Sequence, residues 1–380
     1  MTAVDVWLVI GTRRWARLMA AELCAALPFH NAIHMLGNPA DAELQAWLSS
    51  SGLGAKIRVG ASLPPCPAET TGVAFVVNSA YLHKSSIENL LIAGYNVVCE
   101  KPISFSQVET INLIDMATEL GLQLFCTNTY LFASYLNTFR ENWLTGHRFA
   151  RMCISWADSE REVRYGDTKS YDSSLPLIYD VLPHIANIAL ATIGPFNALA
   201  NGIEVRRGGS EASIHYQHGD LDIYVVLERN ALQRKRTLAF VAEDCQVMLD
   251  FSEEPGVVSV NNTSAVPADP TWQHKPKPIA AMLCSVLKYF EAGKQDPRLS
   301  PSASQFGNDL IDSVVDSYVD QQVLLLSDHR KISNAMASTA DREYAVKEAK
   351  SIAMRTLPYI GESSPLLRLA RAVSIPHCST

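Results

Sequence analysis

Close to its N-terminus the chain carries an almost unbroken apolar run, Val4–Ile10, which Gly11 ends. Such a run is typical of a strand buried on both faces, as in parallel sheets that helices cover on both sides. Strand-like and helix-like segments then alternate up to residue 127. The expected strands are 4–10, 32–36, 73–77, 96–99 and 122–126, and the expected helices are 15–27, 85–93 and 106–120. This alternation predicts right-handed βαβ units, and therefore an α/β fold with a Rossmann-type, doubly wound parallel sheet.

The pattern changes after residue 127. Strand-like runs with short turns fill residues 198–251, and helical segments surround them. The further helices are expected at 132–144, 177–193, 279–291 and 301–327, and a strand at 149–157. This half predicts an α+β domain built on a mostly antiparallel sheet. We therefore expect a dinucleotide-binding Rossmann domain (1–127), a substrate-binding and oligomerisation domain (128–330) and a helical C-terminal extension (331–380).

The turn after the first strand lies where a dinucleotide fingerprint is expected. In that fingerprint one glycine makes the tight turn, a second lets the backbone approach the pyrophosphate, and a third small residue lets helix and strand pack closely. Gly11 and Ala16 meet the first and third requirements, but Arg13 occupies the second position. Arg13 either weakens pyrophosphate binding sterically or, together with Arg14, presents guanidinium groups to a cofactor phosphate at the positive end of the helix.

The end of the second strand indicates which nicotinamide cofactor is used. NAD-binding sheets usually place an Asp or Glu there to bind the ribose hydroxyls. Here the strand ends in Gly37-Asn38-Pro39, and Asp41 is the first acid. A missing carboxylate removes the repulsion that a 2′-phosphate would meet, and two arginines lie nearby. The sequence therefore favours NADP(H) over NAD(H).

The next two strands end in polar residues at the edge of the sheet where ligands bind in open α/β folds. Asn78-Ser79-Ala80-Tyr81-Leu82-His83 follows one of them, and Glu100-Lys101-Pro102 follows the other. A lysine at this edge can donate a proton or hydrogen bond to a carbonyl or imine that is being reduced.

These motifs resemble the glucose–fructose oxidoreductase / inositol dehydrogenase (Gfo/Idh/MocA) family. Its members show a Thr-Pro-Asn-x-x-His turn, a helix ending in Ala-Gly, and a strand closing with Glu-Lys-Pro. Here Asn78-Ser79-Ala80 replaces Thr-Pro-Asn, whereas His83, Ala93-Gly94 and Glu100-Lys101-Pro102 match. The resemblance is good over the first 130 residues and weaker to about residue 330. It implies an NAD(P)-dependent oxidoreductase that moves hydride to or from a small carbonyl/hydroxyl or imine/amine substrate, including one bound to a carrier.

The resemblance also implies a partner motif for the lysine, an Asp followed four residues later by a His on one helix. Asp180 and His184 supply it, and this spacing places both on the same helix face. There the carboxylate can orient an imidazole that works as acid or base near neutral pH. Leu182 stands where the family usually has Gly between them, and Tyr130 and Leu131 replace a basic neighbour of the retained Asn128.

The expected site residues fall into three groups. The catalytic candidates are Lys101, Asp180 and His184. The cofactor-binding candidates are Gly11, Thr12, Arg13, Arg14, Trp15, Asn38, Asn78, Ser79, His83, Glu100, Lys101 and Asn128. The substrate candidates are Tyr130 after the fifth strand, Tyr165 and Tyr171 in the loop 161–171 that leads into the helix of Asp180, and Tyr179 on that helix. No metal is expected, since no ligand set converges on Asp180 and His184.

Two alternatives stay open. The opening Gly-Thr-Arg is similar to that of the thiazolinyl imine reductases, a branch in which His typically replaces the lysine that this chain keeps. The other alternative is a non-catalytic binding or regulatory protein that keeps the fold. Arg13 in the glycine turn and the missing acid after the second strand motivate it.

Charge and composition limit the partners. A net charge of −7 with dispersed Lys and Arg gives no basic face for nucleic acid. No apolar stretch reaches the roughly 18 residues of a membrane span, and no signal peptide is recognised. Eight scattered cysteines indicate a reducing cytoplasm rather than a disulfide framework. We expect a homodimer or homotetramer in which Tyr216, Tyr224 and Val226, on an exposed sheet face, contact a second subunit.

Overall fold

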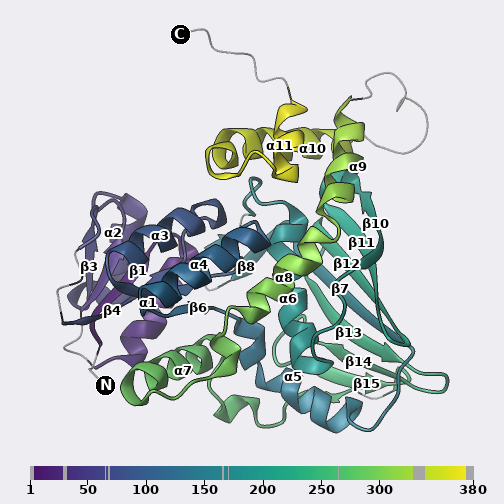
Figure 1. Ribbon diagram of the computed structural model, residues 1–380. Helices are drawn as coiled ribbons and strands as arrows, with labels where there is room; N and C mark the ends of the chain where they lie inside the picture. Colours follow the sequence, from purple (N-terminus) through teal and green to yellow (C-terminus); the bar gives the residue numbers. More distant parts are fainter. Residues whose placement is uncertain are drawn as a thin grey trace. The chain divides into compact units, whose positions relative to one another are not determined.

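The computed structural model in Figure 1 consists of two compact units. The first unit comprises residues 1–133 and 274–305, and the second comprises residues 134–273 and 306–380. The structure describes residues 4–28, 32–64, 66, 69–164, 167–169, 171–263, 265–327 and 339–373. The segment 274–305, which the sequence analysis assigned to the second domain, thus belongs to the first unit.

The sheet of the first unit is parallel and has the strand order β3-β2-β1-β4-β5-β6. Its strands are β1 (Val4–Ile10), β2 (Ile33–Leu36), β3 (Ile57–Gly60), β4 (Thr71–Val76), β5 (Tyr95–Cys99) and β6 (Leu124–Cys126). The order reverses between β1 and β4, which is the switch point of a doubly wound sheet. The predicted Rossmann-type α/β fold is therefore confirmed, although β3 and the helix before it were not predicted.

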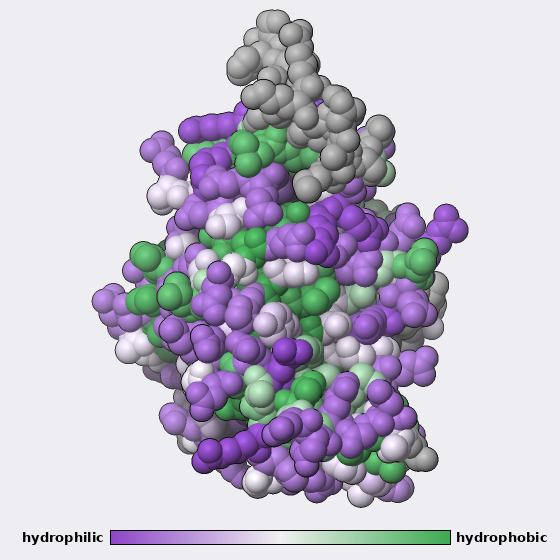
Figure 2. Space-filling model, turned by 90° about the vertical axis from the view of Figure 1, so that its right-hand side faces the viewer, coloured by the Kyte–Doolittle hydropathy of each residue, from purple (hydrophilic) through white to green (hydrophobic). Residues whose placement is uncertain are grey.

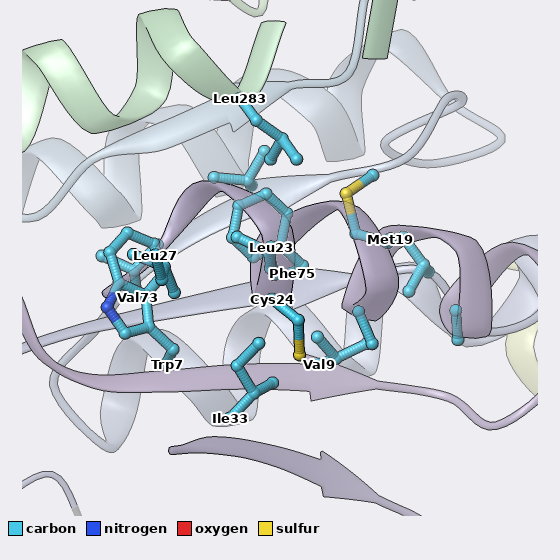
Figure 3. Close-up of a cluster of buried hydrophobic side chains, with 14 of the residues drawn as sticks. Trp7, Val9, Met19, Leu23, Cys24, Leu27, Ile33, Val73, Phe75 and Leu283 are labelled. Atoms are coloured by element: carbon cyan, nitrogen blue, oxygen red, sulfur yellow. The ribbon is translucent and has the colours of Figure 1, made fainter. Parts of the chain in front are cut away.

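Helices of the first unit bury one apolar face each against this sheet. They are α1 (Arg14–Ala26), α2 (Ala42–Ser51), α3 (His83–Ile92), α4 (Gln107–Glu119) and α7 (Pro278–Ala292). Met19 and Leu23 of α1 share a core cluster with Phe75 of β4. Leu283 of α7 joins the same cluster (Figure 3), so a helix far along the chain completes the Rossmann core.

The second unit is built on an eight-stranded sheet with the order β10-β11-β12-β7-β13-β14-β15-β16. Only β12 and β7 pair in parallel, so the predicted mostly antiparallel sheet is confirmed. The strands are β7 (Arg151–Ser159), β10 (Ala200–Arg206), β11 (Glu211–His218), β12 (Leu221–Ala231), β13 (Lys235–Val241), β14 (Gln246–Asp250), β15 (Val257–Val260) and β16 (Val266–Pro267). A separate hairpin pairs β8 (Glu162–Arg164) with β9 (Asp167–Lys169).

Helix α6 (Leu177–Thr192) packs on β11 and β12 and is buried along most of its length, as expected for a helix that is apolar on all sides. The helix predicted at 132–144 is instead a short helix, α5 (Ser134–Phe139), between turns of 3-10 and π geometry. The helix predicted at 301–327 is divided into α8 (Ser302–Asp312) and α9 (Val315–Ser327).

The two faces of the large sheet differ sharply in exposure. Ile223 and Val225 of β12 are fully buried, whereas Tyr224 and Val226 between them are 37% and 39% exposed. Tyr216 was predicted on the exposed face, and this prediction is wrong. Tyr216 pairs with Ile223, so it shares the buried face of the sheet. It is fully buried and its hydroxyl donates to Leu310 O at 3.1 Å.

The C-terminal helices belong to the second unit. Helix α10 (Thr339–Ser351) packs on α9 and on the turn η5 (Arg207–Gly209), and α11 (Pro365–Arg371) packs on α9. Arg368 of α11 donates to Asp320 of α9 at 2.6 Å. Within the described residues, no helix is both long and apolar enough to cross a membrane.

Candidate functional site

The turns after β1 and β4 touch at the switch point of the Rossmann sheet. Gly11 has φ +128°, and a Cβ there would lie 3.2 Å from Val77 O and 3.3 Å from Asn78 Cα. Because both neighbours are backbone atoms, a side chain at Gly11 would be strained and crowded. The glycine therefore allows the two turns to approach closely, which is the part that the first glycine plays in the dinucleotide fingerprint.

Helix α1 begins at this turn. Arg13 is its N-cap residue, is extended (φ −81°, ψ 179°), and its side chain makes no capping hydrogen bond. It is exposed, whereas Thr12, Arg14 and Trp15 are half-buried. The first turn of α1 contains no acid of its own, and Trp15 in that turn lies against the buried carboxyl group of Glu100.

The end of β2 presents an amide rather than a carboxylate. Gly37 lies against Thr12, whose Cγ2 would be only 2.0 Å from a Cβ at residue 37. Asn38 is exposed, and its Oδ1 accepts from Ala40 N at 3.0 Å. Asp41 caps α2 by accepting from Leu44 N at 3.0 Å. The nearest acid in the chain is thus used for a helix cap.

His83 joins the turn after β4 to the turn after β5. Its side chain is 1% exposed, with Nδ1 2.7 Å from Pro102 O and Nε2 3.3 Å from Asn78 O. Burial lowers the pKa of His83 to about 4, so the ring is neutral and carries one N–H. We assign that hydrogen to Nδ1, which makes the shorter contact. His83 was predicted to bind cofactor; in the structure its two ring nitrogens face the backbone of the two turns, which the side chain braces.

This buried histidine makes stability depend on pH. The unfolded chain binds a proton at His83 below about pH 6.5, whereas the folded chain does so only near pH 4. Stability is therefore present above pH 6.5 and is lost as pH falls toward 4, by about 2 kcal/mol between roughly pH 7.5 and 5. Chemical unfolding at these two pH values measures the free energy of unfolding. Between pH 7.5 and 5 this free energy should fall less in His83→Gln than in the parent. His147→Gln, at an exposed site, should keep the parent's loss, and an equal loss in all three proteins would contradict the assignment.

Glu100 and Lys101 lie at the carboxyl end of β5. Burial raises the pKa of Glu100, against the opposing charge of Lys101 and a hydrogen bond from Thr127 Oγ1 to Glu100 Oε2. Lys101 is only 9% exposed. An ammonium group that is buried beside a carboxyl group is held in place and can deliver a proton in a defined direction.

Asn128, predicted to contact cofactor, is buried and anchors a loop of its own unit. Its Nδ2 donates to Arg298 O at 3.0 Å and to Ser300 O at 3.1 Å. Both amide hydrogens are thereby used. Asn78 Nδ2 likewise donates to Ser86 Oγ at 2.9 Å, and Ser79 next to it is half-buried. Tyr130 is half-buried in the turn Thr129–Phe132.

In the second unit, Asp180 and His184 lie one turn apart on α6, and each has a partner from the sheet. Asp180 Oδ2 accepts from Arg229 Nη2 of β12 at 3.1 Å. The His184 ring stacks on Trp156 of β7 with centroids 4.9 Å apart and planes at 17°. Sequence reasoning missed Arg229, although a signal was present. Arg229 has the same parity in β12 as the buried residues Ile223, Val225 and Leu227, so it points inward.

The stacking partner of His184 is itself held by charged groups. The guanidinium of Arg236 lies 3.5 Å from the centroid of the Trp156 ring. Arg236 also donates to Asp158 Oδ1, and Trp156 Nε1 donates to Asp158 Oδ2 at 3.3 Å. The Trp156 ring on which His184 stacks is therefore held in place.

The tyrosines predicted to bind substrate have different environments. Tyr179 is 2% exposed and belongs to the core of the second unit. Tyr171 is half-buried and stacks on Tyr344 of α10, with centroids 6.0 Å apart. Tyr165 lies outside the described residues. The structure also assigns Lys101 to the first unit, and Asp180 and His184 to the second. Among the described residues no group of three or more His, Cys, Asp or Glu is placed to hold a metal.

Comparison with known proteins agrees with this geometry. Residues 9–128 match the family model GFO_IDH_MocA, described as "Oxidoreductase family, NAD-binding Rossmann fold". This segment belongs to that family. The family predicted from Glu100-Lys101-Pro102 and His83 is therefore confirmed for residues 9–128, and the chain is an NAD(P)-dependent oxidoreductase. No curated protein matches the chain.

Solved structures extend the likeness to both units. UDP-N-acetylglucosamine 3-dehydrogenase GnnA from Acidithiobacillus ferrooxidans is 16% identical with TM-score 0.62, over 83% of this chain and 96% of that one. KijD10, a 3-ketoreductase from Actinomadura kijaniata in complex with NADP and TDP-benzene, is 15% identical with TM-score 0.63, over 82% and 97%. Biliverdin reductase from Synechocystis sp. PCC 6803, in complex with biliverdin and NADP+, is 15% identical with TM-score 0.60, over 81% and 97%. At these identities the structures show that the chain shares the two-domain fold.

Proposed function

We propose that this oxidoreductase uses NADPH to move hydride to or from a small carbonyl/hydroxyl or imine/amine substrate, and that Lys101 supplies the proton. The observation that carries the proposal is the buried Lys101, held beside Glu100 at the carboxyl end of β5 in a family of NAD-binding oxidoreductases. The nicotinamide, when bound, supplies the hydride chemistry.

The residues of the first unit fit such a cofactor. A Cβ at Gly11 would crowd the backbone of the turn after β4, so glycine there permits the tight turn of a dinucleotide fingerprint, and the first turn of α1 contains no acid. Exposed Arg13 supports a 2′-phosphate, as does the amide of Asn38 where NAD-specific sheets have a carboxylate. These features favour NADPH over NADH.

Each catalytic candidate has a role in the proposed reaction. Lys101 gives a proton to the oxygen or nitrogen of the group being reduced, or removes it in the reverse direction. His184, held against Trp156, is a second proton carrier, and Asp180 keeps it oriented. Three proteins of similar structure, a UDP-N-acetylglucosamine 3-dehydrogenase, a 3-ketoreductase and a biliverdin reductase, support a small organic substrate.

Cofactor binding gives the direct test. Titration of the tryptophan fluorescence, to which Trp15 contributes beside the glycine turn, should show binding of NADPH that is at least about tenfold tighter than that of NADH, since one charged contact is worth about 1.5–3 kcal/mol. Arg13→Ala should remove most of this difference, and Arg148→Ala, at an exposed site in the other unit, should keep it.

A second candidate function follows from the same arginine. Arg13 at the second glycine position would also suit a protein that keeps the fold and binds a ligand without catalysis. If neither NADPH nor NADH changes the fluorescence at millimolar concentration, the proposed reaction fails and this candidate replaces it.

We also propose a homodimer or homotetramer, formed through the sheet face that carries Tyr224 and Val226. These side chains are 37% and 39% exposed, and the ring of Tyr224 stacks on His215 at 4.6 Å. The face of the protein drawn in Figure 2 carries hydrophobic patches between hydrophilic side chains. Light scattering that finds only monomer at micromolar concentration would refute this assembly.

A further inference from the structure

A buried guanidinium lies between two carboxylates in the second unit. Arg229 is 1% exposed, and its Nη2 donates to Asp180 Oδ2 at 3.1 Å. Its Nη1 donates to Leu175 O at 2.9 Å, just before α6, and lies 3.9 Å from Glu348 Oε1. Arg229 therefore connects the helix of Asp180 to a carboxylate that comes from a different part of the chain.

That second carboxylate is delivered by the C-terminal helix α10. Glu348 is 1% exposed, and its Oε2 accepts from Gln322 Nε2 of α9 at 2.9 Å. The hydroxyl of Tyr318 lies 3.4 Å from the same oxygen. The Tyr318 hydroxyl donates its hydrogen to Gly209 O at 2.9 Å. Burying a carboxylate is costly unless it is paired and hydrogen-bonded, so the place of Glu348 here depends mainly on Arg229 and Gln322.

We propose that Glu348 is a positioning residue for Asp180, and that it acts through Arg229 by sharing the charge of the guanidinium. The proposal rests on the proposed function, in which Asp180 orients His184. It assigns to the C-terminal extension a part in tuning the proton chemistry of α6.

The charges of Glu348 and Arg229 decide whether the pKa of Asp180 rises or falls. When Glu348 is ionised, it offsets part of the positive field of Arg229, and the Asp180 carboxylate is stabilised less. When Glu348 is neutral, the full field acts on Asp180 and lowers its proton affinity. The side chain of Asp180 is 29% exposed and can exchange protons with solvent, whereas that of Glu348 is 1% exposed. Burial raises the pKa of Glu348 to about 7, so both states are populated near neutral pH.

Two tyrosines also contact the guanidinium of Arg229. Tyr344 of α10 hydrogen-bonds with it, and the ring of Tyr171 lies 5.0 Å from it. Tyr344 stacks on Tyr171, over which Lys347 also lies at 5.1 Å. On the packed elements, Arg207 of η5 pairs with Glu228, Arg355 lies 3.5 Å from Asp172, and Arg368 of α11 pairs with Asp316 and Asp320. Arg229 is the cation that the structure pairs with both Glu348 and Asp180.

The test is a pH titration of Asp180 by carbon NMR, with aspartate labelled at the side-chain carboxyl carbon. The signal of Asp180 is the one that disappears in Asp180→Asn. Glu348→Gln keeps an acceptor for Gln322 and removes the charge, so we expect the pKa of Asp180 to fall by roughly one unit. Glu343→Gln, at an exposed position of the same helix, should leave it unchanged. No change in Glu348→Gln, or equal changes in both variants, would overturn the proposal.

The parent protein provides a second measurement in case Glu348→Gln does not fold. Its Asp180 signal should show a second, smaller inflection between about pH 6 and 8, where Glu348 titrates. A single inflection would overturn the proposal. Neither measurement needs cofactor or turnover. A failed cofactor titration therefore refutes the proposed function, whereas a failed NMR titration refutes the link between Glu348 and Asp180.

Discussion

Replacing Lys101 by Ala is expected to lower turnover by about 10²–10⁴, the usual contribution of a positioned acid or base. Affinity for NADPH should stay close to that of the parent, because Gly11, Arg13 and the N-terminus of α1 are unchanged. The measurement combines the fluorescence titration with the rate of NADPH consumption. The substrate is the best one found in a panel of sugars, keto acids and imines.

Lys84→Ala is the matched control. Lys84 lies in the same unit, and its ammonium group pairs with Glu109 of α4 at 2.8 Å. Its turnover should equal that of the parent. If Lys101→Ala turns over as fast as Lys84→Ala, then Lys101 is not the proton donor. If it loses NADPH affinity as well, its role is in binding rather than in the proton step.

The second large effect is expected at Gly208, where η5 meets the C-terminal helix α10. Gly208 has φ +64°, and a Cβ there would lie 1.8 Å from Asp341 O and 3.1 Å from Ala345 N. These are backbone atoms of α10, so they cannot swing away. Gly208→Ala should therefore separate α10 from η5 and lower the free energy of unfolding by about 2–4 kcal/mol.

Gly219→Ala is the control for Gly208→Ala, because it introduces the backbone strain of a positive φ without a steric clash. Gly219 has φ +59° in the turn between β11 and β12, and no atom lies within 4 Å of its added Cβ. It should lose only the roughly 1 kcal/mol that a left-handed alanine costs. Chemical unfolding measures both losses, and limited proteolysis shows whether α10 becomes accessible. Equal losses in the two variants would mean that α10 does not dock on η5 as described.

The Rossmann half was predictable because its strands are buried on both faces and so appear as apolar runs. β1 and β5 are of this kind, and Gly94 and Gly121 end helices at positions of positive φ. β3 was missed because it spans four residues and includes exposed Arg58, which leaves no apolar pattern. Tyr216 was placed on the wrong face because a strand's parity is decided by its pairing, which local sequence does not contain.

The residues of the candidate site also fall into those that the sequence predicts and those that only the fold reveals. Lys101, Asp180 and His184 could be named from short motifs, because their spacing within a strand end or a helix turn is local. The bracing role of His83 could not, since its partners Pro102 and Asn78 belong to two different turns. Arg229 and Glu348 are 119 positions apart and meet only because β12 and α10 fold together.

The amino-acid sequence by itself determined the Rossmann half, its family and the residue types at the carboxyl ends of the strands. Hydrophobic periodicity and turn chemistry act over a few residues, so these features can be inferred without the fold. Tertiary structure alone decided that α7 completes the Rossmann core, that His83 is a neutral brace, and that Asp180 shares Arg229 with Glu348. Burial and charge pairing depend on which distant segments pack together, and no local pattern in the chain specifies that.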